Sequence, residues 1–306
     1  MTTTDAALGF VGLGKMGEPM VLRLLDAGYR VSAFNRNAAK LRAACAAGAA
    51  PCTSPADVAR RADIVFLCVS DSAAVEAVVF GTDGIAAGAR AGTLLVDCSS
   101  ISPRATRDMA ARLAASAGMR WVDAPVSGGV LGAQNGTLIF LCGGAAEDVA
   151  RVRPVLARLG QRATHLGPVG SGQLAKLCNQ AIVGTNLAVI AEVMNLARRA
   201  GLDAARLPAA LEGGFADSLP LRIYGPRMAT GGPAPPQGEV ATMLKDLDNV
   251  LEQARALGVS LPVAGLAAEL YRLVADRGLR RADLQHLVRL YDGAPADSGP
   301  DGASGP

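Results

Sequence analysis

A lysine and two amide side chains share one face of a long predicted helix, and they are the first candidates for chemistry in this chain. Asn179 and Gln180 follow Lys176 by three and four positions, a spacing that puts helical side chains on the same face. An ammonium and an amide that converge can bind an oxygen of a small ligand. Alternatively, the lysine stem covers apolar surface near a helix start and the amide is buried and hydrogen-bonded.

The helix that carries these residues is predicted to span 170–199, a stretch without proline. At ~1.5 Å per residue it would be roughly 45 Å long. Apolar side chains surround most of it, so neighbouring elements must cover nearly every face. Polar residues, among them Lys176 and Glu192, also lie inside it, and they are costly in hydrocarbon. The sequence therefore favours a central helix of a globular protein over a membrane span.

A second constellation lies near the N-terminus, where an apolar run at 8–11 leads through a glycine motif into a helical pattern at 18–27. The motif consists of Gly12, Leu13, Gly14, Lys15, Met16 and Gly17. Strand, GxGxxG and helix are the context that a dinucleotide-binding fingerprint requires. The glycines permit a tight turn, close approach of a pyrophosphate and packing of the helix on the strand. We predict that these six residues bind a dinucleotide; a glycine turn without a ligand is the alternative.

The turn after the second predicted strand, at 30–34, indicates which dinucleotide is bound. It reads Asn35, Arg36, Asn37 and lies about twenty residues beyond the glycines, where an NAD site usually has an acid for the ribose hydroxyls. An arginine there can instead bind a 2′-phosphate through paired charged hydrogen bonds. The sequence favours NADP over NAD, with Asn35 and Arg36 as ligands. Alternatively, Arg36 is solvated or stacks on the adenine of NAD.

Strands and helices continue to alternate, which predicts a doubly wound α/β sheet of the Rossmann type. Strands are expected at 8–11, 30–34, 64–69, 93–96, 121–125, 138–142 and 163–166, all in one sheet. Helices are expected at 18–27, 38–47, 55–61, 73–79, 103–117 and 147–159. Ser54 and Ser102 are expected to cap the helices that begin with Pro55 and Pro103.

Ligands of open α/β sheets bind at the carboxyl ends of the strands. Val69 and Ser70 leave the third strand there, and Ser100 follows the fourth. We expect all three to contact the cofactor, with Ser100 at the nicotinamide or ribose. An ordinary loop hydroxyl is the alternative for Ser100.

The strand at 121–125 leads into Ser127, Gly128 and Gly129. Two glycines after a serine at a strand end expose backbone N–H groups that could form a nest for a carboxylate. A flexible turn without a ligand is equally compatible with these residues.

Beyond the long helix only helical patterns follow, at 203–211, 218–228, 239–257, 262–275 and 283–291. We expect a dinucleotide-binding domain at 1–168, an all-helical domain at 169–292, to which the resemblance described below assigns substrate binding and oligomerisation, and a disordered tail at 293–306. The segment 213–218, with Arg222 and Arg227 after it, either faces the cleft and sets substrate choice or forms a helix corner.

Composition excludes several classes of function. A net charge of +3 without a Lys/Arg block does not imply a nucleic-acid partner. Six scattered cysteines and two histidines lack metal-ligand spacing, and they are interpreted as reduced thiols of a cytoplasmic protein without a metal. The N-terminus lacks the features of a signal peptide.

Together these motifs resemble the β-hydroxyacid dehydrogenase family, which includes 3-hydroxyisobutyrate dehydrogenases and tartronate semialdehyde reductases. The similarity runs over 7–292 and is carried by GFVGLGKMGEPM at 9–20, DAPVSGGVLGAQNGTL at 123–138, GSGQLAKLCNQ at 170–180 and KDLDN at 245–249. The resemblance implies a Rossmann domain joined by the long helix to a helical domain that completes the site. It also implies a homodimer or homotetramer.

The resemblance assigns roles to individual residues. Lys176 matches the catalytic lysine, and the Ser127-Gly128-Gly129 segment matches the substrate-carboxylate site. Lys245 matches the lysine of the KDL motif, near cofactor and substrate. Many members have two asparagines after the catalytic lysine, whereas this chain has Asn179 and Gln180, a pair associated with the tartronate-semialdehyde-like branch. Both amides are expected to bind a substrate oxygen.

The activity implied is hydride transfer between NADP or NAD and a short 3-hydroxy acid or its semialdehyde, with Lys176 as general acid and base. An imine reductase is disfavoured by Lys176, and a 6-phosphogluconate dehydrogenase by the short chain. A non-catalytic NADP-binding sensor is disfavoured because Lys176, Lys245 and the Ser127-Gly128-Gly129 segment occur together. The expected partners are a small carboxylate substrate and further copies of this chain, without nucleic acid or membrane.

Overall fold

The computed structural model of this chain describes residues 6–232 and 237–292. Its contacts form two compact units, Met1–Asn179 and Gln180–Pro306. The predicted tail at 293–306 lies outside the described residues.

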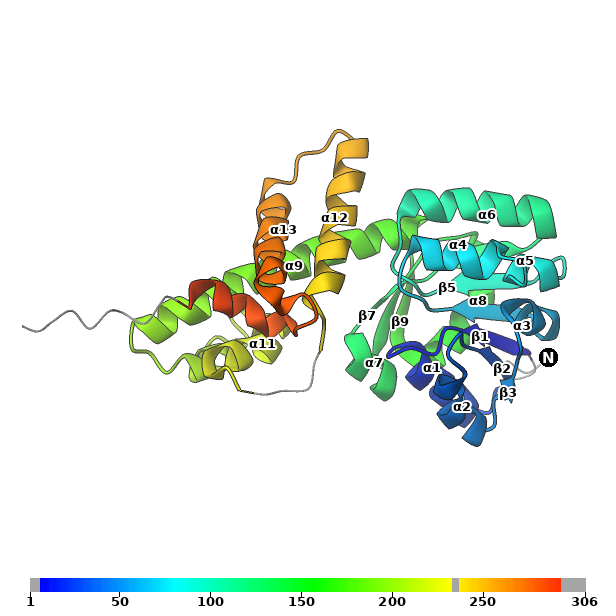
Figure 1. The fold of residues 1–306 in the computed structure, drawn as a ribbon, viewed down its shortest axis with the longest axis horizontal. Coiled ribbons are helices and arrows are strands. Elements are labelled where there is room, and N and C mark those ends of the chain that lie inside the picture. Colours follow the sequence, from blue (N-terminus) through cyan, green and yellow to red (C-terminus); the bar gives the residue numbers. More distant parts are fainter. Residues whose placement is uncertain (1–5, 233–236, 293–306) are drawn as a thin grey trace, which may run out of the picture. The chain divides into compact units, whose positions relative to one another are not determined.

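A six-stranded parallel sheet forms the centre of the first unit (Figure 1). Its strands are β1 Leu8–Val11, β2 Val31–Phe34, β3 Ala50–Pro51, β4 Ile64–Leu67, β5 Leu94–Asp97 and β6 Arg120–Asp123. They run in the order β3-β2-β1-β4-β5-β6, so the direction of winding reverses between β1 and β4. The predicted doubly wound class is confirmed, and a ligand is expected at that switch point.

Helices cover both faces of this sheet because its central strands are apolar on both sides. They are α1 Gly17–Asp26, η1 Ala38–Leu41, α2 Arg42–Ala46, α3 Pro55–Arg61, α4 Ser72–Phe80, α5 Ile85–Gly88 and α6 Pro103–Ala117. One core joins the sheet to α1, and the other joins it to α3, α4 and α6. The predicted caps are confirmed, since Ser54 accepts from Asp57 N and Ser102 accepts from Ala105 N.

The last strands of this unit do not extend the main sheet, which corrects the prediction of a single sheet. β7 Val126–Ser127, β8 Leu138–Cys142 and β9 Gly160–His165 form a separate three-stranded sheet, with α7 Gly129–Asn135 and α8 Ala146–Leu159 between them. Pro125 follows β6 and has no N–H to continue a ladder. At the end of β6, Asp123 forms only an isolated bridge with Gly143, and the chain after Pro125 starts a new sheet.

The long helix is confirmed as α9, Ser171–Arg199. Among the described residues of the second unit the other helical elements are η2 Ala204–Arg206, α10 Leu207–Ala210, α11 Leu219–Thr230, α12 Val240–Ala256, α13 Pro262–Val274, η3 Ala275–Leu279 and η4 Leu284–Tyr291. The predicted helix at 203–211 is two short turns, and the one at 283–291 is a 3₁₀ helix. Both differ because short segments take the geometry that their neighbours impose.

Close packing in the second unit depends on Gly184 of α9. A Cβ at this position would lie 3.1 Å from a methyl group of Leu247 and 3.3 Å from the sulfur of Met243, both on α12. The hydroxyl of Tyr271, on α13, donates to the Gly184 carbonyl at 3.2 Å. The small residue therefore lets three helices meet around one buried tyrosine.

Length and apolar composition alone would allow α9 to cross a membrane, and in its most apolar window 44% of the residues are buried inside the protein. Core helices of soluble proteins can have the same length and composition. The polar residues inside α9 favour a core helix over a membrane span, because polar groups are costly in hydrocarbon.

Candidate active site

The glycine turn between β1 and α1 has the geometry that the sequence predicted. Gly12 adopts a φ of +98°, which favours glycine. A Cβ on Gly17 would collide with the carbonyl oxygen of Gly12 and lie 3.0 Å from the Phe10 ring. These two glycines are therefore required by the protein itself.

Gly14 is different, and its surroundings test whether a dinucleotide fits. A Cβ there would meet no protein atom within 4 Å, and the residue lines a cavity. Packing does not require glycine at this position, whereas close approach of a phosphate to the backbone would. The next residues enter α1, whose N-cap Met16 supplies no side-chain hydrogen bond, and the first N–H groups of a helix attract anions.

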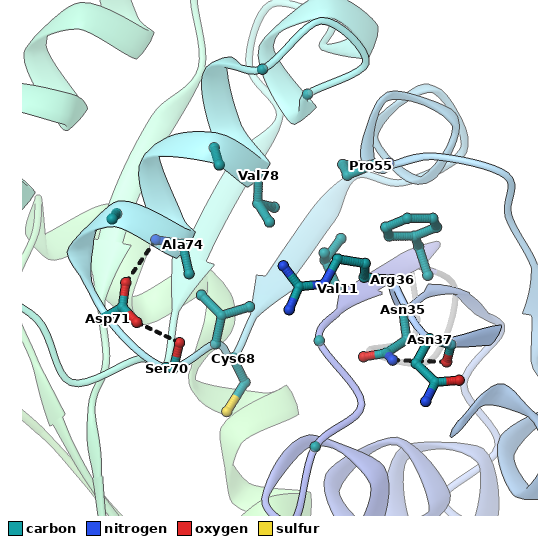
Figure 2. Close-up of a pocket in the computed structure, with 18 of the residues that line it drawn as sticks. Val11, Asn35, Arg36, Asn37, Pro55, Cys68, Ser70, Asp71, Ala74 and Val78 are labelled. Atoms are coloured by element: carbon teal, nitrogen blue, oxygen red, sulfur yellow. Dashed lines mark hydrogen bonds between the residues drawn. The ribbon is translucent and has the colours of Figure 1, made fainter. Parts of the chain in front are cut away.

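The cavity has a volume of about 820 Å³ and lies at the ends of β1, β2 and β4, the switch point of the sheet. Figure 2 shows the Arg36 side chain turned toward its interior. Predicted cofactor residues among its lining are Gly12, Gly14, Asn35, Arg36, Val69 and Ser70. The structure thus brings six predicted residues from three loops to one cavity.

Amide side chains fix the turn that presents Arg36. Asn35 accepts a hydrogen bond from the backbone N–H of Leu13 at 2.9 Å and donates to the carbonyl of Asn37 at 2.9 Å. Asn37 in turn accepts from Ala39 N at 3.0 Å. Asn35 therefore ties this turn to the glycine turn. Lys40 was not predicted from the sequence, but it also lines the cavity. It lies in η1, directly after the turn that follows β2, and this position was the available signal.

Ser70 and Ser100 differ in their surroundings. Ser70 donates to the Asp71 carboxylate at 2.6 Å, and Asp71 also caps α4 by accepting from Ala74 N (Figure 2). Ser100 follows β5 and is half-buried; among the described residues it is not one of those that line this cavity. Its predicted contact with nicotinamide or ribose stays a prediction.

Two carboxyl groups, neither foreseen from the sequence, lie side by side and fully buried at the ends of β5 and β6. Asp97 accepts from Ser99 N through one oxygen, and within the described part of the chain its other oxygen has no hydrogen-bond partner. Burial raises the pKa of Asp97 to about 7, with a smaller contribution from Asp123. Near neutral pH Asp97 therefore holds a proton in a large share of molecules.

Asp123 holds the start of α9. Its carboxylate accepts from Gly170 N at 2.8 Å and from Gln173 N at 2.9 Å. Burial raises the pKa of Asp123, and these N–H donors oppose that rise. Lys176 lies one turn further along α9 with 9% of its side chain exposed. These hydrogen bonds fix the start of α9 on the sheet. They also fix the direction in which Lys176 leaves the helix.

The predicted substrate residues of the first unit converge. The hydroxyl of Ser127 donates to the amide oxygen of Asn179 at 3.3 Å. Gly128 and Gly129 adopt φ values of +120° and +61°, so their turn depends on glycine. Asn179 follows Lys176 by about one helical turn on α9. Its hydrogen bond to Ser127 therefore brings the part of α9 that carries Lys176 to the strand end with the glycine turn.

Gln180 and Lys245 belong to the second unit, where both interact with Asp246. The Gln180 amide donates to one Asp246 oxygen at 2.6 Å, and the Lys245 ammonium lies 3.0 Å from the other. Asp246 is 3% exposed. This aspartate was not predicted as a site residue, although it stands beside Lys245 in the KDL motif. Its carboxylate orients the Gln180 amide that was predicted to bind substrate.

The cysteine beside the cavity and the arrangement of possible metal ligands also bear on the predicted site. Burial raises the pKa of Cys68, beside the cavity, to about 12, so the reactive thiolate is scarce at neutral pH. Across residues 6–232 and 237–292, no group of three or more His, Cys, Asp or Glu side chains is placed to hold a metal ion.

A parallel sheet wound in this order, with a glycine turn and a cavity at its switch point, defines a dinucleotide-binding protein. Residues 7–167 match the family model for the NAD-binding domain of 6-phosphogluconate dehydrogenase. Residues 170–291 match the NAD-binding model of NADP-dependent 3-hydroxyisobutyrate dehydrogenase. The two matches together cover nearly all of the described chain.

Individual relatives agree with these models. The chain is 38% identical to the 2-hydroxy-3-oxopropionate reductase of Escherichia coli and 35% identical to the NAD-dependent L-serine dehydrogenase of Pseudomonas aeruginosa, in each case over 93% of this chain and 97% of the relative. The solved structure of Mycobacterium tuberculosis 3-hydroxyisobutyrate dehydrogenase with L-serine is 32% identical, with a TM-score of 0.84 over 94% of this chain and 99% of that one.

The chain therefore belongs to the β-hydroxyacid dehydrogenase family, which confirms the resemblance inferred from the motifs. It is an NAD(P)-dependent hydroxyacid oxidoreductase and uses a nicotinamide cofactor.

The buried Asp97 carboxyl predicts a stability that falls with rising pH. Its folded-state pKa of about 7 exceeds the ordinary value of 3.8, so its contribution is fully present below pH 3.8 and is lost as pH rises through 7. Asp97→Asn imitates the protonated form. Relative to wild type, the variant should gain about 2 to 3 kcal/mol of unfolding free energy between pH 5 and pH 8.

Urea unfolding followed by Trp121 fluorescence measures this gain, because Trp121 is the single tryptophan and lies 3% exposed on the neighbouring β6. Asp108→Asn is the matched control, since that carboxylate is 72% exposed on α6. A difference between Asp97→Asn and wild type that stays constant with pH would contradict the assignment of the proton.

Proposed function

We propose that the enzyme interconverts a short 3-hydroxy acid and its semialdehyde. L-Serine, 3-hydroxyisobutyrate and 2-hydroxy-3-oxopropionate, the compounds that the names of its relatives specify, are all C2-substituted propanoic acids with an alcohol or aldehyde at C3. They differ at C2, which carries an amino group, a methyl group or a hydroxyl. A site that holds the carboxylate and reacts at C3 therefore accounts for all three.

The proposal is carried by one observation: Lys176, largely buried, lies one turn from Asn179, whose amide oxygen accepts from the Ser127 hydroxyl. Gly128 and Gly129 would offer backbone N–H groups to the substrate carboxylate. When bound, the nicotinamide supplies or accepts the hydride. Lys176 would stabilise the charge that develops on the C3 oxygen and donate the proton in reduction, or accept it in oxidation.

The amides and the second lysine complete this assignment. Asn179 and Gln180 would hydrogen-bond a substrate oxygen, with Gln180 oriented by Asp246 at 2.6 Å. Lys245, which pairs with Asp246 at 3.0 Å, would lie near cofactor and substrate, as the resemblance implies. Asp246 would thus act on both groups through two charged hydrogen bonds.

Initial rates with a panel of aldehydes test the reaction: tartronate, methylmalonate and succinate semialdehydes, and glyoxylate, each with NADPH and NADH. We expect turnover of at least one semialdehyde. Lys176→Ala should lower kcat at least about 100-fold, because a positioned general acid contributes 10²–10⁴-fold. NADPH affinity, measured by fluorescence, should change little.

Cys178→Ser provides the control, since this exposed residue is on the same helix two positions further and has no assigned role. Wild-type turnover in Lys176→Ala would remove the lysine from the mechanism. Cofactor binding without turnover of any aldehyde would instead favour an imine reductase or a sensor.

We further propose that NADP is the preferred cofactor. The turn after β2 carries Arg36 without an acidic residue at Asn35 or Asn37, and both Arg36 and Lys40 line the cavity. Two cations at the position expected for the ribose would bind a 2′-phosphate, whereas NAD has no phosphate to offer them there. NADH would then bind more weakly.

Arg36→Ala should raise the KM for NADPH about 10- to 100-fold, which corresponds to loss of a charged hydrogen bond worth 1.5–3 kcal/mol. The KM for NADH should stay nearly constant. Lys40→Ala should show the same selectivity with a smaller effect. Arg42→Ala is the matched control, because Arg42 lies in the next helix and bonds the Ala39 carbonyl. Equal losses for both cofactors would point instead to adenine stacking by Arg36.

We also propose that copies of this chain associate through the helical unit, in the cytoplasm. Apolar side chains remain exposed at Ile182, Val189 and Leu196 of α9 and at Val263 and Leu266 of α13, each more than half exposed. The three residues on α9 are seven positions apart and therefore share one face. An exposed apolar stripe of this kind marks an interaction surface.

Sedimentation should therefore give a mass of at least twice the 31.1 kDa of the chain. The double variant Ile182→Asp, Leu196→Asp should shift it toward one chain, whereas Leu131→Asp, at an exposed apolar residue of the first unit, should not. A monomeric wild-type protein at micromolar concentration would refute the association.

A further inference from the structure

Gln173 connects two parts of the first unit that are far apart in sequence. Its side chain is 1% exposed. The amide oxygen accepts from Ile101 N at 3.1 Å, and the amide nitrogen donates to the Ser99 carbonyl at 2.8 Å. One planar group thus satisfies a backbone donor and a backbone acceptor on either side of Ser100.

The loop that Gln173 binds is itself fixed to two neighbouring strands. The Ser99 hydroxyl accepts from Val69 N at 3.0 Å, and Val69 lines the dinucleotide cavity at the end of β4. The backbone N–H of Ser99 donates to Asp97, at the end of β5. One hydrogen bond from Val69 and one to Asp97 thus hold Ser99 at the ends of β4 and β5 independently of Gln173.

The other side of Gln173 is the first turn of α9. Its backbone N–H donates to Asp123, as does that of Gly170. Lys176 follows by three residues, close to one full turn. The position of Gln173 relative to the loop consequently determines where the first turns of α9, and the Lys176 ammonium, are presented.

A requirement for hydrogen bonding explains the residue type. A buried apolar side chain here would leave Ile101 N–H and the Ser99 carbonyl without partners, at a cost for each. A carboxylate could accept from Ile101 but would face the Ser99 carbonyl with a second acceptor. A carboxamide, or a protonated carboxyl group, supplies one donor and one acceptor.

We propose that Gln173 is a positioning residue of the oxidoreduction: it couples the loop of Ser99, Ser100 and Ile101, beside the dinucleotide cavity, to the helix turn that presents Lys176. The inference rests on the proposed function, in which Lys176 transfers the proton. Displacement of a catalytic group by about 1 Å can cost 10²-fold in rate, so the coupling acts on kcat without a direct contact to substrate.

Gln173→Ala removes both side-chain bonds and should lower kcat about 10- to 100-fold. The dissociation constant of NADPH should stay within about threefold, because the glycine turn and Arg36 are not altered. Gln173→Glu keeps the shape of the side chain. Its protonated form restores donor and acceptor, so its kcat relative to wild type should rise toward wild type as pH falls.

The pH profile separates the two variants. Gln173→Ala should remain impaired by a constant factor at every pH, whereas Gln173→Glu should recover in acid, since burial beside other carboxyl groups keeps the new carboxyl protonated above its ordinary range. Titratable or charged groups on the surrounding elements are Asp97, Cys98, Asp123, Lys176 and Arg107 of α6. They titrate in wild type as well, and Gln173→Ala, which adds no titratable group, measures their contribution to the profile; only the additional pH dependence of Gln173→Glu is assigned to the new carboxyl and its coupling to them.

Hydrogen exchange provides a readout that does not depend on turnover. Peptides that cover 98–102 and 170–180 should both exchange faster in Gln173→Ala than in wild type. Gln285→Ala is the matched control: this glutamine is also buried and donates to the Gly232 carbonyl at 3.2 Å, but in the helical unit. It should leave both peptides and kcat unchanged.

Unchanged kcat in Gln173→Ala, or exchange that rises at 170–180 without 98–102, would overturn the proposal. So would loss of kcat and NADPH affinity in equal measure, or failure of Gln173→Glu to recover in acid. If wild type turns over none of the aldehydes while both peptides still respond together, the coupling stands and the proposed substrate class fails.

Discussion

The carboxylate of Asp123 fixes the start of α9, and the geometry of the site depends on that contact. The first N–H groups of any helix lack partners within it, and two of them, on Gly170 and Gln173, are bound here by one buried acid. Cβ atoms on Gly143 or Gly172 would lie 2.6 and 2.9 Å from the Asp123 oxygens. Neither glycine can therefore be replaced by a larger residue without displacing the Asp123 carboxylate. The start of α9 is thus held in one position relative to the sheet.

The buried carboxyl groups of Asp97 and Asp123 differ in the hydrogen bonds that they accept. Asp97 and Asp123 are paired in register at the ends of adjacent strands, and two buried like charges at this separation are costly. Asp123 has N–H donors on both oxygens and stands at the positive end of a helix dipole. Asp97 has one N–H donor and is the natural site of the proton. The proton on Asp97 thus lets Asp123 keep the charge that holds α9.

Local signals predicted most of the fold and the residues of the glycine turn and the turn after β2 that line the cavity. The glycine motif, the cap at Ser102 and the long helix are visible because the residues involved are close in sequence. Lys40 was missed because a lone lysine after a turn resembles a solvated residue. The hydrogen bonds that give Asp246 and Gln173 their roles were missed because they join residues 66 and 72 or more positions apart, and no pattern in the chain records such a pairing. The second sheet was missed because the chain after Pro125 still alternates as a continuing sheet would.

The residues proposed to select the cofactor are exposed, whereas those that position Lys176 are buried. Arg36 and Lys40 are exposed side chains on a turn held by Asn35, so their replacement removes charge without opening the core. Asp97, Asp123 and Gln173 are buried, and each satisfies backbone groups of another segment. Loss of any one leaves a buried polar group unpaired. Cofactor preference can therefore change by surface substitution, whereas the placement of Lys176 is constrained by the same hydrogen bonds that hold the sheet and the helix together.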